Sequence, residues 1–171
     1  TVVIDDVALT EGNTGTQNLS FTVTRSSTAG AFSVDFATSN GTASAGSDYT
    51  AATGTLSFTA GGVLTQTITV PVTGDVSVEA NETFNVNLSN LVNSSLTANI
   101  TDNLGVGTIN DNDAATVQFN PVTVSQSEAT SPMAFAVTLT NPVQSGVTVR
   151  VDSAFGTATA ADFTAITNGT V

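Results

Sequence analysis

The amino-acid sequence predicts an all-β fold, an immunoglobulin-like antiparallel β-sandwich, present as one complete repeat and part of a second. Apolar and polar residues alternate with a period of two in short runs, as in strands that bury one face. Gly, Asn, Asp or Ser bounds each run, and these residues favour turns. Val, Ile and Thr are abundant and long runs of helix-forming residues are absent, which also favours strands.

Seven strands are expected in the first part of the chain, each from its own alternation. For example, Leu19, Phe21 and Val23 share one face of a strand. A further apolar stretch, Leu96–Ile100, is interpreted as an excursion within the last connection rather than as a strand. The expected strands are Val2–Leu9, Asn18–Arg25, Phe32–Thr38, Thr55–Phe58, Thr65–Val72, Thr83–Ser89 and Val106–Ile109.

The chain also repeats itself. Residues 41–49 read Gly-Thr-Ala-Ser-Ala-Gly-Ser-Asp-Tyr, and residues 156–163 read Gly-Thr-Ala-Thr-Ala-Ala-Asp-Phe. A period of about 115 residues indicates tandem domains, because the repeats of solenoids are much shorter. We therefore expect a complete repeat over residues 1–113 and the N-terminal half of a second repeat over residues 114–171.

Composition excludes several classes of partner. The formal net charge is −12, Lys is absent, and Arg25 and Arg150 are the only basic side chains. Nucleic acids and anionic membrane surfaces attract basic proteins, so neither is expected as a partner. The sequence has no transmembrane run, so direct membrane insertion is not expected. Without Cys, the chain forms neither disulfides nor thiolate metal sites.

The acidic residues are predicted to gather at one pole of the sandwich. Successive antiparallel strands run in opposite directions, so the first, third, fifth and seventh strands end at the same pole. Like charges gathered there need a counter-charge, and Ca²⁺ takes six to eight oxygen ligands. We therefore expect Ca²⁺ as the cofactor. The carboxylates that follow these four strands are Glu11, Asp48, Asp75, Glu79, Glu82, Asp111 and Asp113.

The first repeat resembles the Calx-beta domain, which occurs in sodium–calcium exchangers and in bacterial surface proteins. The resemblance rests on Glu11-Gly12, the motif at residues 41–49, Gly54-x-Leu-x-Phe58, Asp75-x-x-x-Glu79-x-x-Glu82-x-Phe84 and Thr108-Ile-x-Asp111-x-Asp113. It implies calcium sites formed by these acids at one end of the sandwich. It also implies metal ligands at Glu128 and Asp162, the second-repeat counterparts of Glu11 and Asp48.

The sequence departs from the exchanger-type pattern at two places. Thr73-Gly74-Asp75 stands where that pattern has an unbroken run of acids, and Asn112 lies between Asp111 and Asp113. Fewer charges imply fewer ions or weaker binding.

Simpler structural interpretations remain open for individual acids. Asp48 and Asp75 are also suited to stabilising turns. Glu79 and Glu82 are also suited to a solvated face. Four other acids are expected to be solubility charges rather than ligands: Asp5, Asp6, Asp35 and Asp102.

The sequence does not predict an enzyme. His, Cys and Lys are absent, and Ser and Thr have no neighbouring base. A carboxylate pair can cleave glycosides, but no Trp accompanies these acids as a sugar platform.

The predicted function is a calcium-binding structural repeat of an extracellular adhesin, stalk or surface filament, with calcium stiffening the junction between repeats. The alternative is a calcium-regulated ligand-binding or sensor module. The expected partners are neighbouring repeats of the same protein. Other subunits are a second possibility, through strand donation at Met133–Leu139 or Val147–Val151. The chain opens with Thr1 rather than Met, which predicts a processed or excised piece. The predicted function implies an extracellular or cell-surface location.

Overall fold

The computed structural model describes residues 1–93, 98–130 and 132–171. The chain divides into two compact units, Thr1–Asp113 and Ala114–Val171, which are called here the first and second units. Strands are the regular elements of the described residues, so the predicted all-β class is confirmed. Within these residues, no helix has the length and apolar character needed to cross a membrane.

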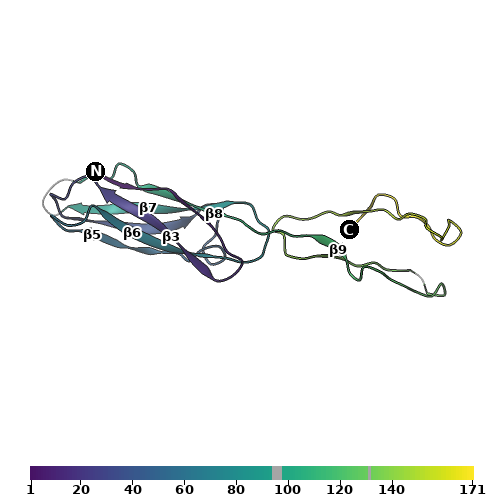
Figure 1. Cartoon of the computed structure of the whole chain (residues 1–171). Helices are drawn as coiled ribbons and strands as arrows, with labels where there is room; N and C mark the ends of the chain where they lie inside the picture. The colour runs from purple at the N-terminus through teal and green to yellow at the C-terminus, as the bar shows by residue number, and fades with distance from the viewer. Residues whose placement is uncertain (94–97, 131) are drawn as a thin grey trace. The chain divides into compact units, whose positions relative to one another are not determined.

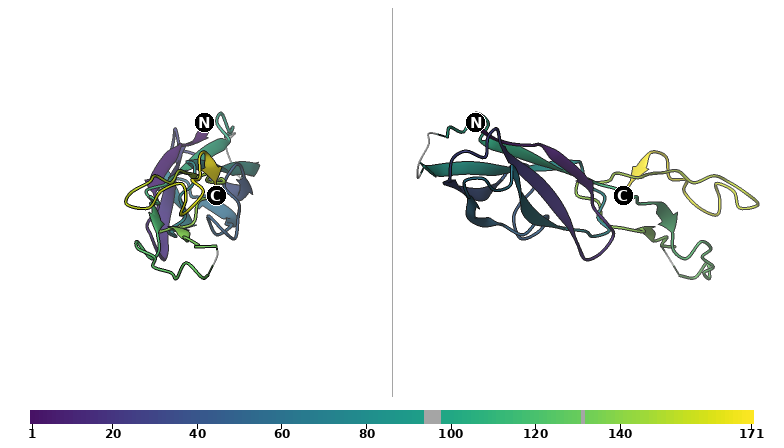
Figure 2. Two further views of the ribbon diagram at one scale, coloured as in Figure 1. Left: turned by 90° about the vertical axis from the view of Figure 1, so that its right-hand side faces the viewer. Right: turned by 60° about the vertical axis from the view of Figure 1, so that its left-hand side comes forward.

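The first unit is a sandwich of two sheets (Figures 1 and 2). A three-stranded sheet has the order β1-β3-β6, and a five-stranded sheet has the order β2-β8-β7-β4-β5. Most neighbouring strands are antiparallel, whereas β2 and β8 are parallel. The strands are β1 (Val2–Ile4), β2 (Val7–Thr10), β3 (Thr16–Arg25), β4 (Phe32–Asn40), β5 (Thr53–Phe58), β6 (Thr65–Thr73), β7 (Glu82–Asn93) and β8 (Leu104–Asn110).

The first predicted strand is two strands in different sheets, so its prediction as a single element was wrong. The break falls at Asp5 and Asp6, whose side chains accept backbone hydrogen bonds from opposite sheets. Asp5 Oδ1 accepts from the N–H of Thr22 at 2.6 Å, and Asp6 Oδ1 accepts from the N–H of Val106 at 2.7 Å. The carboxylates thus supply partners to both sheets where the chain crosses between them.

The last strand keeps the direction expected from the sequence. β7 and β8 are antiparallel, so the connection between them does not change which pole β8 reaches. The stretch interpreted as an excursion lies partly outside the described residues, because 96 and 97 are among those not described. Its last residue, Ile100, forms an isolated parallel bridge with Val2.

The core lies between the two sheets and includes the aromatic side chains of Tyr49 and Phe84. Tyr49 is 1% exposed and stacks on Phe84 with ring centroids 4.3 Å apart. Phe84 also meets Phe21 edge-on at 5.9 Å. The Tyr49 hydroxyl donates to Asn40 Oδ1 at 2.7 Å. Stacking on Phe84 and this hydrogen bond together fix the position of the ring. Because Asp48 directly precedes Tyr49, this packing also fixes the backbone of an acidic loop.

Arg25 is buried at the end of β3, where the chain leaves this strand. Its side chain donates to the carbonyl oxygens of Gly30, Thr59 and Val63, each at 2.8 Å. It also lies 5.3 Å from the ring centroid of Phe58. A strand of ten residues spans about 33 Å. The guanidinium is therefore held far from the loop that precedes β3.

The second unit contains two short antiparallel pairs. β9 (Val117–Phe119) pairs with β10 (Val137–Leu139), and β11 (Arg150–Val151) pairs with β12 (Gly169–Thr170). Large apolar side chains stay exposed in this unit, for example Phe155 at 52% and Ile166 at 51%. Inward-facing apolar side chains of a sandwich are exposed in this way when no second sheet packs on them. The assignment of this unit as half of a repeat stays a prediction.

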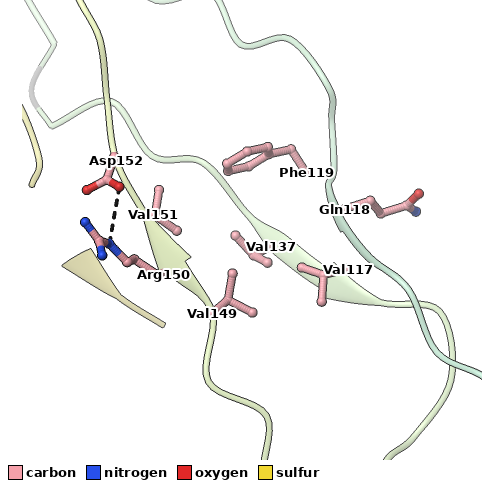
Figure 3. Close-up of a pocket in the computed structure, with 8 residues that line it drawn as sticks. All are labelled: Val117, Gln118, Phe119, Val137, Val149, Arg150, Val151 and Asp152. Atoms are coloured by element: carbon pink, nitrogen blue, oxygen red, sulfur yellow. Dashed lines mark ion pairs between the residues drawn. The ribbon is translucent and has the colours of Figure 1, made fainter. Parts of the chain in front are cut away.

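Figure 3 shows a pocket in the second unit, lined by both apolar and charged side chains. The side chains of Val117, Val137 and Val149 line one open pocket of about 220 Å³. Arg150 and Asp152 form an ion pair at its side, with 3.3 Å between Nε and Oδ2. The edges predicted for strand donation contain β10 and β11, which pair with β9 and β12 of the same chain.

Candidate metal centre

The acidic loops meet at one end of the first unit, as the direction of its strands predicts. β2 and β8 run in parallel and end together, with Thr10 opposite Asn110. β7 begins beside them, with Glu82 opposite Ile109. The end of β4 lies beside the start of β7, with Asn40 opposite Phe84. We call this end of the first unit, with its seven acidic residues, the acidic pole.

Six of the seven ligands predicted in the first unit form two groups. Glu11, Asp111 and Asp113 form the first. In each group, one carboxylate oxygen from every member lies within 4.8 Å of those from the other two. Glu11 is the most buried member, at 7% exposed. The second group consists of Asp48, Glu79 and Glu82, all half-buried.

Gly74 allows two loops of the acidic pole to touch. A Cβ on Gly74 would lie only 1.8 Å from the carbonyl oxygen of Gly12. The Gly74 N–H donates to the Gly15 carbonyl at 2.9 Å, which holds the loops together. This contact brings the loop after Glu11 against the loop that carries Asp75. It gives a structural reason for glycine at position 74, where a side chain would collide with backbone.

Asp48 and Asp75 both have the turn-stabilising role that was the simpler alternative. Asp48 Oδ2 accepts from the Ser44 N–H at 2.6 Å, and Asp75 Oδ1 accepts from the Ser77 N–H at 2.7 Å. Each of these bonds engages one carboxylate oxygen. A carboxylate has two oxygens, so the turn role is compatible with a ligand role.

Asp75 belongs to neither group, but its charge acts on both. Burial raises the pKa of Glu11 from 4.5 to about 7, and the charges of Asp75, Glu79, Asp111 and Asp113 add to the effect. Burial likewise raises the pKa of Glu79, with Asp75 the largest charge contribution. The pKa of Asp113 is also raised, through burial and then the charges of Asp111 and Asp75. The two groups therefore share one negative field.

Two carboxylate oxygens of the first group are buried without a hydrogen-bond partner, Asp111 Oδ1 and Asp113 Oδ2. A buried acceptor without a partner destabilises a fold, more so when it carries charge. Arg25 lies at the other end of β3, and Arg150 belongs to the second unit. A bound cation would satisfy these oxygens, and an all-oxygen set of carboxylates suits Ca²⁺. The residues present therefore fit the metal expected from the sequence.

The second unit does not bring its predicted ligands into such a group. Among the described residues, neither Glu128 nor Asp162 belongs to a group of three acids. Glu128 is exposed in a turn. Asp162 Oδ2 accepts from the N–H and hydroxyl of Thr159 at 2.7 and 2.9 Å. These hydrogen bonds lower the pKa of Asp162. The ligand role of both residues stays a prediction.

Sequence reasoning missed three asparagines at the acidic pole. Asn13 Nδ2 donates to Asp113 Oδ1 at 2.6 Å, and Asn112 Nδ2 donates to Asn13 Oδ1 at 3.3 Å. Asn81 Oδ1 accepts from the Asp111 N–H at 3.2 Å. The available signal was position, because each asparagine lies within two residues of a predicted ligand.

The four other acids act within the sandwich rather than at the pole. Asp5 and Asp6 accept backbone hydrogen bonds where the chain crosses between the sheets. Asp35 accepts hydrogen bonds from Thr55 and Asn90, and Asp102 accepts one from the Leu104 N–H. They therefore stabilise local structure in addition to carrying charge.

The family model of the Calx-beta domain matches residues 5–104 and 110–169, so the chain belongs to the Calx-beta domain family. This confirms the resemblance seen in the sequence. No curated protein sequence matches the chain.

Solved structures agree with this assignment. The apo-form Calx CBD1 domain is 26% identical with a TM-score of 0.56, and the match covers 66% of this chain and 98% of that one. The calcium binding domain CBD12 of CALX1.1 is 27% identical with a TM-score of 0.57, over 66% of this chain and 46% of that one. This chain therefore matches less than half of the CBD12 structure. The Calx CBD2 domain, at 18% identity and a TM-score of 0.53, shares the fold.

Proposed function

We propose that the first unit binds Ca²⁺ at the acidic pole. The observation that carries this proposal is the pair of buried, unpartnered oxygens on Asp111 and Asp113, beside the buried carboxylate of Glu11. Similarity to a structure described as a calcium binding domain supports it. When bound, calcium would supply the positive charge that the pole lacks.

Each group of carboxylates has a distinct part in this proposal. Glu11, Asp111 and Asp113 hold one ion from the start of the β2–β3 loop and the segment after β8. Asp48 in the loop after β4, Glu79 in the loop before β7 and Glu82 at the start of β7 hold a second ion. Asp75 lies in the field of both groups and contributes charge to each.

Isothermal titration of the full chain with Ca²⁺ tests the proposal. Asp48→Asn combined with Glu82→Gln removes two charges from the second group, so the heat from one of two sites should disappear. Asp5→Asn combined with Asp102→Asn is the matched control, because it also removes two charges, away from the pole. Unchanged binding in the first double variant would refute the ligand assignment.

Affinity separates the structural role from a sensor role. Extracellular calcium modules bind with dissociation constants of about 10⁻⁴–10⁻³ M, and sensors with about 10⁻⁷–10⁻⁵ M. Asn112 and Gly74 reduce the charge of this pole, which favours the weaker range. We therefore favour a structural repeat of an extracellular adhesin, stalk or filament. Weak binding suits that location, because free calcium is kept low inside cells. The sensor module remains the second candidate, and a micromolar constant would support it.

Calcium at this pole would stiffen the link to the second unit. Asp111 and Asp113 directly precede Ala114, where the second unit begins. An ion held by these residues would restrict the backbone that follows them. NMR order parameters for residues 114–116 should rise from below about 0.6 towards 0.85 when calcium is added. Values that do not change would refute the stiffening role.

Neighbouring repeats are the partners that this arrangement favours. The exposed Phe135, Phe155 and Ile166 need a covering sheet, and strands equivalent to β6, β7 and β8 of a repeat would supply one. Strand donation by another subunit is the alternative. Light scattering over a range of chain concentrations distinguishes the two, because donation gives a mass that rises with concentration.

A further inference from the structure

The segment that carries Asp111 and Asp113 is fastened to the first unit by side-chain amides. Asn13 donates to Asp113 Oδ1 at 2.6 Å and accepts from Asn112 Nδ2 at 3.3 Å. Asn81 Oδ1 accepts from the backbone N–H of Asp111 at 3.2 Å. The loop after β2 and the loop before β7 therefore both hold this segment.

The chemistry of the groups fixes the orientation of the Asn13 amide. An ionised carboxylate only accepts hydrogen bonds, so Asn13 must present its NH₂ group to Asp113. Its carbonyl oxygen then faces the other way and needs a donor, which Asn112 supplies. A carboxylate at position 112 would have no proton to donate when ionised, so an asparagine suits this contact better than an acid.

We propose that Asn13 is a positioning residue for the calcium site, acting through Asp113. Its amide engages Oδ1 of that carboxylate, while Oδ2 is buried without a partner and stays available to a cation. A Lys or Arg in its place would also hold Asp113, but its charge would oppose calcium. A neutral donor orients the carboxylate and leaves its negative charge in place.

This arrangement holds the first group together before calcium arrives. Glu11, Asp111 and Asp113 each place a carboxylate oxygen within 4.8 Å of the others, so their like charges repel one another. The amide contacts oppose that repulsion by fixing the segment at three points. The ligands are therefore in place before calcium binds. Calcium binding then orders mainly the residues that follow Asp113. The inference rests on the proposed calcium function.

The test compares Asn13→Ala with wild type in calcium titrations of the full chain. Partners that orient metal ligands typically contribute 10–100-fold to affinity, so we expect a loss of at least about tenfold. Asn18→Ala is the matched control, because Asn18 is an exposed asparagine on β3, and its affinity should not change. Asn112→Ala removes only the contact with Asn13 Oδ1 and should cause a smaller loss in the same direction.

The outcomes separate this inference from the function on which it rests. If wild type shows no calcium binding, the proposed function fails and the inference fails with it. If wild type binds and Asn13→Ala binds equally well, only the positioning role fails. A lower melting temperature without a change in affinity would assign Asn13 a merely structural role. Should Asn13→Ala not fold, Asn112→Ala decides, since unchanged affinity there overturns the inference.

Discussion

Without calcium, the first unit should lose stability as the pH rises through the neutral range, chiefly because of Glu11. The pKa of this carboxyl rises from 4.5 to about 7 in the folded protein, and the side chain is 7% exposed. A folded-state pKa above the unfolded value means that the folded state holds its proton more tightly. The resulting stability is complete below pH 4.5 and is lost as the pH rises to about 7.

The size of this effect follows from the shift. At about 1.4 kcal/mol per pKa unit, ionising Glu11 in the folded state costs about 3 kcal/mol. Glu11→Gln keeps the shape of the side chain and removes the charge. The variant should therefore exceed wild type in stability by up to about 3 kcal/mol at pH 8 in the presence of a chelator. In melting temperature this is about 12 °C, at about 4 °C per kcal/mol for a domain of this size.

Thermal unfolding of the full chain between pH 4 and pH 8, with a chelator present, measures this difference. Wild type and variant should coincide at pH 4 and diverge as the pH rises. Saturating calcium should reverse their order at pH 8, because wild type keeps a charged ligand that the variant lacks. If Glu11→Gln is no more stable than wild type at pH 8 in chelator, the reasoning about a buried, repelled carboxylate is wrong.

Asp35→Asn is the control, because it also removes one negative charge, but from a carboxyl whose pKa is shifted in the opposite direction from that of Glu11. Hydrogen bonds from Thr55 and Asn90 lower the pKa of Asp35. Its contribution to stability is present above its ordinary pKa and is lost at more acid pH. The Asn variant should therefore give no gain in stability at pH 8.

Two further predictions concern the packing at each end of the first unit. Gly74→Ala places a methyl group against the Gly12 carbonyl and should lower the free energy of unfolding by roughly 1–3 kcal/mol in urea, whereas Gly146→Ala, with open space around it, should not. Arg25→Ala removes a buried side chain and leaves three carbonyls without their donor, so we expect a loss of about 3 kcal/mol or more in the same assay. Arg150→Ala breaks only an exposed ion pair and should cost under about 1 kcal/mol; equal effects of the two Arg changes would contradict the burial argument.

The sandwich and the position of its acids were predictable because they depend on local pattern. Alternation identifies strands, and strand direction places Glu11, Asp48 and Asp111 at one end. The crossover at Asp5 and Asp6 was missed, although these two successive acids interrupt the alternation and the core-packing residues shift there from Val2 and Ile4 to Val7 and Leu9. Its cause is a pair of hydrogen bonds to residues distant in sequence.

The finer organisation of the acidic pole depends on contacts that a linear pattern does not contain. The contact between Gly12 and Gly74 joins loops that lie far apart in the chain. The bond from Asn13 to Asp113 spans 100 positions. Burial of Arg25 likewise needs carbonyls from separate loops. Residue type alone therefore identified the carboxylates but not the side chains that hold them.

The most direct test of the account is the melting temperature of the first unit at pH 8, with and without calcium. Calcium binds only the folded state in this account, so each tenfold excess over the dissociation constant should add about 1.4 kcal/mol of stability. We expect the transition to rise steadily with calcium concentration and to fall back when chelator is added. A melting curve that chelator and millimolar calcium both leave unmoved would contradict a calcium site at the acidic pole.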